Sequence, residues 1–345
     1  MPNTRQGEGG DPPHQPPPMD HQLFSMSDRK PQLSLFPEEA TPPSPSLPAI
    51  PPGVFFGTST WNYRGWAGQV YSPKVARSRD VNAMLEEYAR YPLFNTVGID
   101  GTFYRPYSRE QFQGLAACLP PGFPCVSKVW EELTIRQFAN VGRFEKLAGQ
   151  RNPHYLNVAL FLREIFEPNW ETFRDHMGPF VFELQACPPH LRPTDTEFSD
   201  ELETFFAQLP AEGKYAIELR DPALLTPAYF AALARHGVAH VFNSWTRMPK
   251  LHEQMAQRPA PTASFEIARL LLKPGRRYDE AVQTFKPYDR IQEPQPEVRA
   301  DTVGLLRDAR AGERPAYVLV NNRLEGNAPA TIQALAEELE KEDTP

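Results

Sequence analysis

Eight short apolar stretches, each followed at once by polar or charged side chains, constrain the fold of this chain more than any other feature. One of them, Phe94–Ile99, is rich in β-branched and aromatic residues and leads directly into Asp100 and the segment 101–105. Parallel α/β sheets have this pattern because the loops at the carboxyl ends of their strands carry the ligand-binding groups. The sequence therefore predicts one site assembled from many strand ends.

The eight expected strands alternate with segments of helical periodicity. The strands are Val54–Thr60, Phe94–Ile99, Cys125–Val129, Phe180–Gln185, Tyr215–Arg220, Val238–Asn243, Phe265–Leu272 and Ala316–Val320. Helices are expected over Ser78–Tyr91, from Ser108, over Thr134–Leu147, around Leu202–Leu209 and around Ile332–Leu339. The segment Asn157–Met177 either extends the helical layer or adds a short helix around Trp170.

This alternation predicts a TIM (β/α)8 barrel over residues 53–341, followed by a short tail at 342–345. A doubly wound open sheet is the alternative. It is disfavoured because no glycine-rich phosphate-binding motif follows the first expected strand. In a barrel, the polar groups that follow the strands would meet at one end.

Residues 1–52 have a different composition, with 14 of the 39 prolines of the chain. Such a segment buries too little apolar surface to offset the entropy of ordering, so it is expected to be a disordered tail. One apolar island interrupts it at residues 32–36, Gln32-Leu33-Ser34-Leu35-Phe36. The island is interpreted as a linear docking motif, with a chance cluster of apolar residues as the alternative.

Charge and cysteine content narrow the class of protein. The net charge is −7, of which the tail contributes −3 (three basic and six acidic residues), leaving −4 for the remainder. This balance does not indicate a nucleic-acid partner, although it leaves room for a local basic patch. Three cysteines without metal-ligand spacing suit a reducing compartment, and no segment is apolar enough for a signal peptide or membrane span. A cytoplasmic protein without a membrane partner is expected.

Four charged side chains are the catalytic candidates: Asp100, Lys128, Glu218 and Arg220. Glu218 and Arg220 are two positions apart and share one strand face, where they form either a substrate clamp with a general base or a structural ion pair. Lys128 is expected to pair with Asp100 or Glu218 rather than to form a covalent intermediate. Asp100 is either part of the site or a cap for the following turn.

Amide and aromatic side chains at strand ends are the candidates for binding a substrate. They are Trp61, Tyr63, Tyr104, Gln185, Asn243, Asn321 and Asn322. Amides hydrogen-bond sugar hydroxyls or base edges, and the rings could stack on a sugar or base; structural roles at the barrel rim are the alternative. No metal centre and no cofactor are expected, because only Asp100 and Glu218 are well-placed hard ligands.

The loops after the last two strands suggest an anion site. Lys273, Arg276, Arg277 and Arg323 lie there beside Gly275 and Gly326, close to the start of the final helix. TIM barrels often bind phosphate at this position. A solvated basic loop is the alternative.

The order of these motifs resembles the YecE-like family, a domain of unknown function (number 72). The matching pieces are Gly57-Thr58-Ser59 with Trp61 and Tyr63, Phe94-Asn95-Thr96-Val97, Thr102-Phe103-Tyr104-Arg105, Lys128, Gln185 with Pro188-Pro189, Glu218-Leu219-Arg220, and Asn321-Asn322 with Gly326 and Ala328. The resemblance spans the whole predicted barrel. It implies a TIM barrel similar to those of sugar isomerases and endonuclease-IV-type proteins, and it implies no particular activity.

The chain departs from the family pattern at several positions, which implies a divergent branch. Gly98, Asp100, Gly101 and Asn243 stand where the family usually has Glu, Asn, Ser and Asp; Ile135 replaces a His, and Leu271–Gly275 replaces an Arg-x-His-Gly stretch. Chemistry that needs the Glu at 98 or the His at 135 is therefore not carried over.

Two functions remain open. The first is a metal-independent enzyme or binding protein for a small polyhydroxylated or phosphorylated ligand, sugar-like or nucleotide-like, at the carboxyl end of the barrel. The second is an accessory protein of DNA metabolism, because Gln32, Leu33, Leu35 and Phe36 resemble the pentapeptide by which bacterial proteins dock on the replicative sliding clamp. The two can coexist in one tethered protein.

Overall fold

The computed structural model describes residues 47–78, 80–138 and 142–343. The chain divides into two compact units, of which the larger comprises Leu47–Arg136 and Asn152–Pro345. The docking motif at residues 32–36 lies outside the described residues. None of the helices in the described part is both long and apolar enough to cross a membrane.

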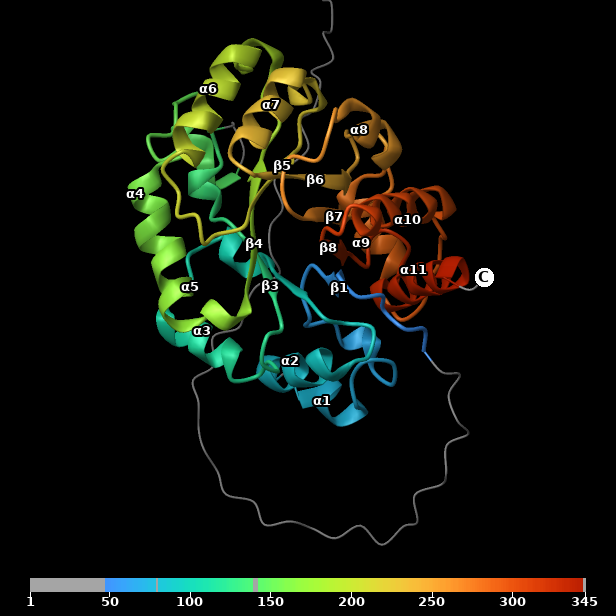
Figure 1. Cartoon of the computed structure of the whole chain (residues 1–345). Coiled ribbons are helices and arrows are strands. Elements are labelled where there is room, and N and C mark those ends of the chain that lie inside the picture. The colour runs from blue at the N-terminus through green and yellow to red at the C-terminus, as the bar shows by residue number, and fades with distance from the viewer. Residues whose placement is uncertain (1–46, 79, 139–141, 344–345) are drawn as a thin grey trace, which may run out of the picture. The chain divides into compact units, whose positions relative to one another are not determined.

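The larger unit is built on eight parallel strands. They are β1 Val54–Thr58, β2 Val97–Ile99, β3 Cys125–Lys128, β4 Met177–Leu184, β5 Tyr215–Leu219, β6 Ala239–Ser244, β7 Glu266–Leu270 and β8 Ala316–Val320. Their order in the sheet is β1-β8-β7-β6-β5-β4-β3-β2, so that from β2 to β8 each strand neighbours its successor in the chain, and β8 neighbours β1. This order confirms the predicted TIM barrel over the open-sheet alternative, and the helices lie around the strands (Figure 1).

Two layers of apolar side chains hold the barrel together. The interior contains Val126, Val181, Ala216 and Ile267 with the rings of Phe265 and Tyr317, all buried. The outer faces of the strands pack against the helices through larger clusters, for example Phe182 with Phe205 and Phe206. This alternation explains the near-continuous apolar strands of the sequence, because strands buried on both faces have no polar side.

Asn95 closes the seam between β1 and β2, the first and last strands in the sheet order. Its backbone N–H and that of Thr96 both donate to the carbonyl of Phe56, at 3.0 and 3.3 Å. Its side-chain Oδ1 accepts from the N–H of Phe56 at 2.7 Å, and its Nδ2 donates to the carbonyl of Val54 at 2.8 Å. Gly57 permits this approach, since a Cβ there would lie 2.0 Å from the carbonyl oxygen of Thr96. One asparagine thus replaces part of a strand ladder.

Eleven α-helices are present in the described part of the chain. They are α1 Pro73–Ser78, α2 Val81–Arg90, α3 Arg109–Ala116, α4 Val158–Phe161, α5 Glu167–Thr172, α6 Asp195–Phe206, α7 Pro227–Arg235, α8 Leu251–Gln257, α9 Tyr278–Phe285, α10 Pro296–Ala311 and α11 Ala328–Asp343. A π-helical segment, Leu162–Phe166, joins α4 to α5. Ser108 caps α3 in a capping box with Gln111, as expected for a helix beginning there.

The predicted helix over Thr134–Leu147 is wrong. The turn Glu131–Leu133 is a 3-10 helix, and Asn152 fixes the backbone around it by donating its Nδ2 to the carbonyls of Glu132 and Ile135, at 2.7 and 2.8 Å. These side-chain bonds satisfy carbonyls that a continuing helix would have used. The helical layer between β3 and β4 is instead supplied by Val158–Thr172, within the segment whose role the sequence left open.

The smaller unit includes Gln137–Arg151. An antiparallel bridge joins Gln137 to Arg151, and a short 3-10 helix, Gly142–Leu147, lies between them. The N–H of Phe138 donates to the carbonyl of Gln150 at 3.1 Å. The segment is therefore a closed loop with its own backbone hydrogen bonds.

Replacing Asn95 with Ala is expected to destabilise the barrel by about 2 kcal/mol, because it leaves polar groups of Phe56 and Val54 without partners at the seam. Urea unfolding of the purified protein measures this loss. Asn62→Ala is the matched control, since Asn62 is exposed and its change is expected to stay within about 0.5 kcal/mol. Equal midpoints for Asn95→Ala and the parent chain would show that the seam does not depend on this side chain.

Candidate functional site

Charged side chains form a layer above the apolar interior, at the carboxyl ends of the strands. Each follows an inward-facing apolar residue by two positions, the repeat of a strand face: Lys128 after Val126, Glu183 after Val181, Glu218 after Ala216, and Arg269 after Ile267. Glu183 and Glu218 are also register partners on β4 and β5. The side chains that fill the barrel therefore change from apolar to charged over two residues along each of these strands.

Glu183 contacts three cations at once. Its Oε2 lies 2.9 Å from Nζ of Lys128, 2.6 Å from Nη2 of Arg220 and 3.5 Å from Nη1 of Arg269. Its Oε1 accepts a hydrogen bond of 2.6 Å from Nε2 of Gln185. Both carboxylate oxygens are thus engaged, which makes Glu183 the hub of the layer.

Arg269 joins the remaining carboxylates. Its Nη1 donates to Oε2 of Glu218, and its Nη2 lies 2.9 Å from both oxygens of Asp100. Arg220 contacts Oε1 of Glu218 at 2.7 Å. Together with Lys128 and Glu183, these residues form a cluster of three cations and three carboxylates, which we call the ionic cluster. Its formal charge sums to zero.

Burial makes these interactions strong. The side chains of Glu218 and Arg269 are 0% and 2% exposed, whereas that of Asp100 is 29% exposed. Burial alone would raise the pKa of Glu183, but Arg220, Lys128 and Arg269 outweigh it and hold the pKa well below its usual range. Burial would likewise lower the pKa of Arg269, and the adjacent carboxylates raise it instead. Glu183 and Arg269 therefore stay charged near neutral pH.

Aromatic rings line the cluster. Nζ of Lys128 lies 3.7 Å from the ring centroid of Phe103, and the guanidinium carbon of Arg220 lies 4.0 Å from that of Trp245. Burial, with Asp100 and Glu183 nearby, raises the pKa of Tyr104 to about 12, so its hydroxyl is a donor at neutral pH. The site combines fixed charges with apolar faces.

Some hydrogen-bonding capacity in the cluster is unused. Among the residues that the structure describes, Nε and Nη1 of Arg220 are buried and have no hydrogen-bond partner. Buried polar groups are normally paired, since leaving one unpaired costs about 1–3 kcal/mol. The cluster is therefore not a closed structural network.

The structure brings together all four catalytic candidates of the sequence: Asp100, Lys128, Glu218 and Arg220. The expected partner of Lys128 was wrong, because its carboxylate is Glu183 rather than Asp100 or Glu218. Glu183 and Arg269 were missed altogether. Each is a charged residue within an otherwise apolar strand, at the same parity as the inward-facing residues, and that signal could have identified both.

Several substrate-binding candidates are built into the packing. Trp61 is buried and donates its Nε1 to the carbonyl of Val81. Oδ1 of Asn322 accepts from Nε1 of Trp66 at 3.1 Å and from the N–H of Ala328 at 2.8 Å, so this amide anchors the start of α11. Oδ1 of Asn321 accepts from the N–H of Arg323 at 3.0 Å. By contrast, Gln185 is exposed and Tyr63 and Tyr104 are partly exposed.

The basic loop after β7 already has carboxylate partners. Lys273 and Arg276 share Glu293, at 2.8 and 2.6 Å, and Arg277 pairs with Asp279. The hydrogen bonds from Lys273 and Arg276 lower the pKa of Glu293 to about 2. Arg323, the fourth cation predicted for this region, stacks on Tyr278 instead. The four cations therefore do not act as one group.

Gly98 occupies a position where a larger residue does not fit. A Cβ there would lie 2.9 Å from the carbonyl oxygen of Ser59 and 3.0 Å from its Cα. The Glu expected from the resemblance would require the backbone at Ser59, just after β1, to move. Asp100, two residues later and at the start of a 3-10 helix that follows β2, brings a carboxylate into the ionic cluster.

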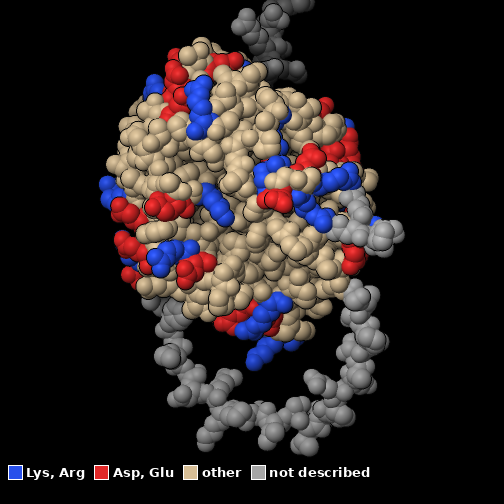
Figure 2. Space-filling view, in the orientation of Figure 1, with Lys and Arg blue, Asp and Glu red and all other residues tan. Residues whose placement is uncertain are grey.

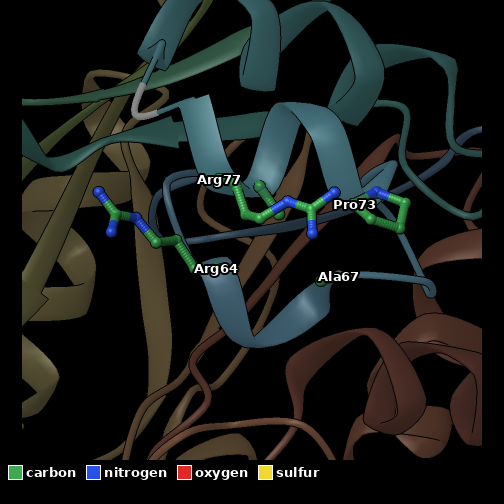
Figure 3. Close-up of a pocket in the computed structure, with 5 residues that line it drawn as sticks. Arg64, Ala67, Pro73 and Arg77 are labelled. Carbon is green, nitrogen blue, oxygen red and sulfur yellow. The ribbon is translucent and has the colours of Figure 1, made fainter.

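A pocket of about 450 Å³ lies beside α1, lined by Arg64, Ala67, Pro73, Ala76 and Arg77. Figure 3 shows the guanidinium of Arg77 extending toward Pro73 and that of Arg64 pointing the other way. The lining includes no residue of the ionic cluster, so we place the chemistry at the cluster rather than in this pocket. Within the described ranges, no group of three or more His, Cys, Asp or Glu side chains could hold a metal ion.

Glu183→Gln is expected to lower the free energy of unfolding at pH 7 by about 3–5 kcal/mol, because it leaves Lys128 and Arg220 buried without their shared carboxylate. The folded-state pKa of Glu183 lies below the usual 4.5, so its contribution is present above pH 4.5 and is lost as the pH falls toward the folded-state pKa. Urea unfolding from pH 7 to pH 3 should therefore show the two proteins converging. Glu86→Gln, at an exposed helical pair with Arg90, is the control and should cost about 0.5 kcal/mol or less. A gap that stays constant with pH would contradict the assignment.

Comparison with known proteins agrees with this architecture. A crystal structure of a DUF72 family protein from Thermotoga maritima matches with a TM-score of 0.56 and 20% identity, over 83% of this chain and 99% of that chain. One from Enterococcus faecalis matches with a TM-score of 0.50 and 13% identity, over 85% of this chain and 98% of that chain. At these identities the likeness shows the fold alone.

No curated protein matches the sequence. The family model described as "Protein of unknown function DUF72" matches residues 55–345, from the second residue of β1 onward, and includes every member of the ionic cluster. The chain belongs to the DUF72 family.

Proposed function

We propose that the protein binds a small polyhydroxylated ligand, sugar-like or nucleoside-like, at the carboxyl end of its barrel, where Asp100 and Lys128 transfer protons. The ionic cluster carries this proposal. Buried ion clusters seldom stabilise a protein more than apolar packing of the same volume, and the cost of desolvating six charged groups is large. A requirement for fixed donors and acceptors at this end of the barrel explains why the interior becomes ionic there.

The composition of the cluster favours hydroxyl groups as its partners. Its formal charge is balanced, so it offers donors and acceptors together without a strong preference for either sign of charge. Carboxylates accept hydrogen bonds from hydroxyls. Two guanidinium nitrogens of Arg220, Nε and Nη1, have no hydrogen-bond partner. The partly exposed ring of Tyr104 supplies the flat apolar surface that sugars and bases stack on.

Asp100 and Lys128 are the members best placed to meet a ligand. Among the carboxylates of the cluster, Asp100 has the most exposed side chain, at 29% against 7% for Glu183 and 0% for Glu218. Lys128 is the cluster's only amine and shares its carboxylate with two arginines. In this proposal Asp100 accepts a proton from a ligand hydroxyl and Lys128 donates one.

Asp100→Asn and Lys128→Met are each expected to weaken binding of a neutral polyol at least tenfold, because each removes a charged hydrogen-bonding partner. Thermal shift and calorimetry against neutral monosaccharides and nucleosides measure the effect. Lys214→Met is the matched control: Lys214 also faces an aromatic ring, that of Tyr317 at 5.8 Å, but it precedes β5 at the opposite end of the barrel. Binding unaffected by either site variant, or absent from the parent chain across the whole set, would refute the proposal.

A second candidate function rests on the sequence motif Gln32-Leu33-Ser34-Leu35-Phe36. We propose that this motif docks the protein on a bacterial sliding clamp, through Gln32 and the apolar side chains of Leu33, Leu35 and Phe36. Such docking would place the barrel near DNA without requiring a basic surface. On the face shown in Figure 2, Lys and Arg side chains are interspersed with Asp and Glu rather than gathered in one region.

The double substitution Leu35→Ala and Phe36→Ala is expected to abolish binding to a purified bacterial sliding clamp, because it removes the apolar anchors. Surface plasmon resonance with the immobilised clamp measures this. The matched control is Leu23→Ala with Phe24→Ala, which alters the same dipeptide elsewhere in the tail. Equal loss of binding in both double variants, or in neither, would count against docking through residues 32–36.

A further inference from the structure

Arg323 differs from the other cations at the carboxyl end of the barrel. It follows β8, and its guanidinium carbon lies 4.4 Å from the ring centroid of Tyr278. Tyr63 and Tyr288 also lie close to its guanidinium, whose positive charge acts to lower the pKa of both phenols. The rings of Tyr63 and Tyr288 also contact each other edge to face, with centroids 5.5 Å apart. We call Arg323 and these three tyrosines the tyrosine cage.

No carboxylate of the described residues forms an ion pair with Arg323, and its Nε is buried without a hydrogen-bond partner. Lys128, Arg220 and Arg269 all pair with carboxylates of the ionic cluster. Asp100 is near enough to raise the pKa of Arg323 together with the tyrosines, against the opposing effect of burial, but its carboxylate is held by Arg269. The cage thus holds a positive charge that the protein does not neutralise locally.

The backbone around this cage has an unusual conformation and unusually close contacts. Tyr288 has φ of +72°, a left-handed conformation that non-glycine residues rarely adopt. It is held there by Asn327, whose Nδ2 donates to the carbonyl of Tyr288 at 2.9 Å. On the other side, Gly65 allows close contact, since a Cβ there would lie 1.9 Å from the carbonyl oxygen of Pro287. Strained backbone of this kind is concentrated at functional sites.

Part of the cage is accessible to solvent. Arg323, Tyr63 and Tyr278 are each partly exposed. Burial raises the pKa of Tyr63 and of Tyr288, which outweighs the lowering effect of Arg323, so both hydroxyls remain protonated and able to donate near neutral pH. A guanidinium with neighbouring hydroxyl donors is well suited to a planar or tetrahedral oxyanion, which Arg binds with parallel hydrogen bonds.

We propose that the tyrosine cage binds one small anionic group, a carboxylate or a phosphate, carried by the ligand of the ionic cluster. The inference rests on the proposed function for the identity of that ligand, and it makes the ligand an acidic or phosphorylated polyol. The anion neutralises Arg323, while the hydroxyls of the same molecule meet Asp100 and the neighbouring donors. Lys273 and Arg276 take no part, because they already share Glu293.

The experiment uses the full chain with inorganic phosphate and with acetate as probes, each titrated against chloride at constant ionic strength. Calorimetry and thermal shift are expected to show binding of at least one probe, and the stronger of the two identifies the anion class. Arg323→Met should weaken that binding at least tenfold. Arg277→Met is the matched control and should leave it unchanged, because Arg277 is exposed and paired with Asp279.

Two further variants separate recognition from structural support. Arg323→Lys keeps the charge but loses the planar fork, and it should retain part of the binding. The double variant Tyr63→Phe and Tyr288→Phe keeps both rings but loses the two hydroxyl donors, and it should weaken anion binding severalfold. If Arg323→Met does not fold, this double variant tests the proposal in its place. Binding of phosphate and acetate by Arg323→Met at the level of the parent chain, or by neither protein, would overturn the proposal.

The outcome is distinguishable from failure of the proposed function. Neutral polyol binding depends on Asp100 and Lys128, whereas anion binding depends on Arg323. Loss of anion binding in Arg323→Met with polyol binding intact supports both proposals. Anion binding that depends on Arg323, in a chain that binds no neutral polyol, supports the cage and refutes the proposed function.

Discussion

The contact of Glu183 with Lys128, Arg220 and Arg269 is the interaction on which the carboxyl end of the barrel depends. Three cations inside a protein repel one another and lose the solvation that water would give them, so they need a shared counter-charge. Glu183 meets them from β4, beside Glu218 on β5, because the two residues are register partners. Parallel pairing of β4 and β5 therefore sets the geometry of the site as well as the fold.

Closure of the barrel matters for the same reason. Asp100 and Arg269 are 169 positions apart in the chain, yet Nη2 of Arg269 donates to both carboxylate oxygens of Asp100. That contact requires β2 to be held against β1, and β1 to be joined through β8 to β7. Asn95 supplies the bonds at the seam, so an amide at the start of one strand determines where a carboxylate at its end is placed.

Much of the fold could be predicted from the sequence, because strands buried on both faces leave long apolar runs and Ser108 has a recognisable capping pattern. The helix expected at Thr134–Leu147 could not be excluded, since the bonds from Asn152 that replace it come from a residue outside the segment. Within the site, Asp100, Lys128, Glu218 and Arg220 were recognisable as polar groups at strand ends. Glu183 and Arg269 lie inside apolar strands, and only the inward parity of those positions distinguishes them.

The shared carboxylate has a consequence for how this protein can change over time. Because three cations balance three carboxylates and share partners, the loss of any one member of the ionic cluster leaves a charge without its counter-charge. Neutral drift at one of these six positions is therefore blocked unless a second position changes with it. In a barrel of this kind, we expect ligand specificity to change through substitutions at more exposed positions such as Gln185 and Tyr104. Substitutions in the ionic cluster are expected only in compensating pairs.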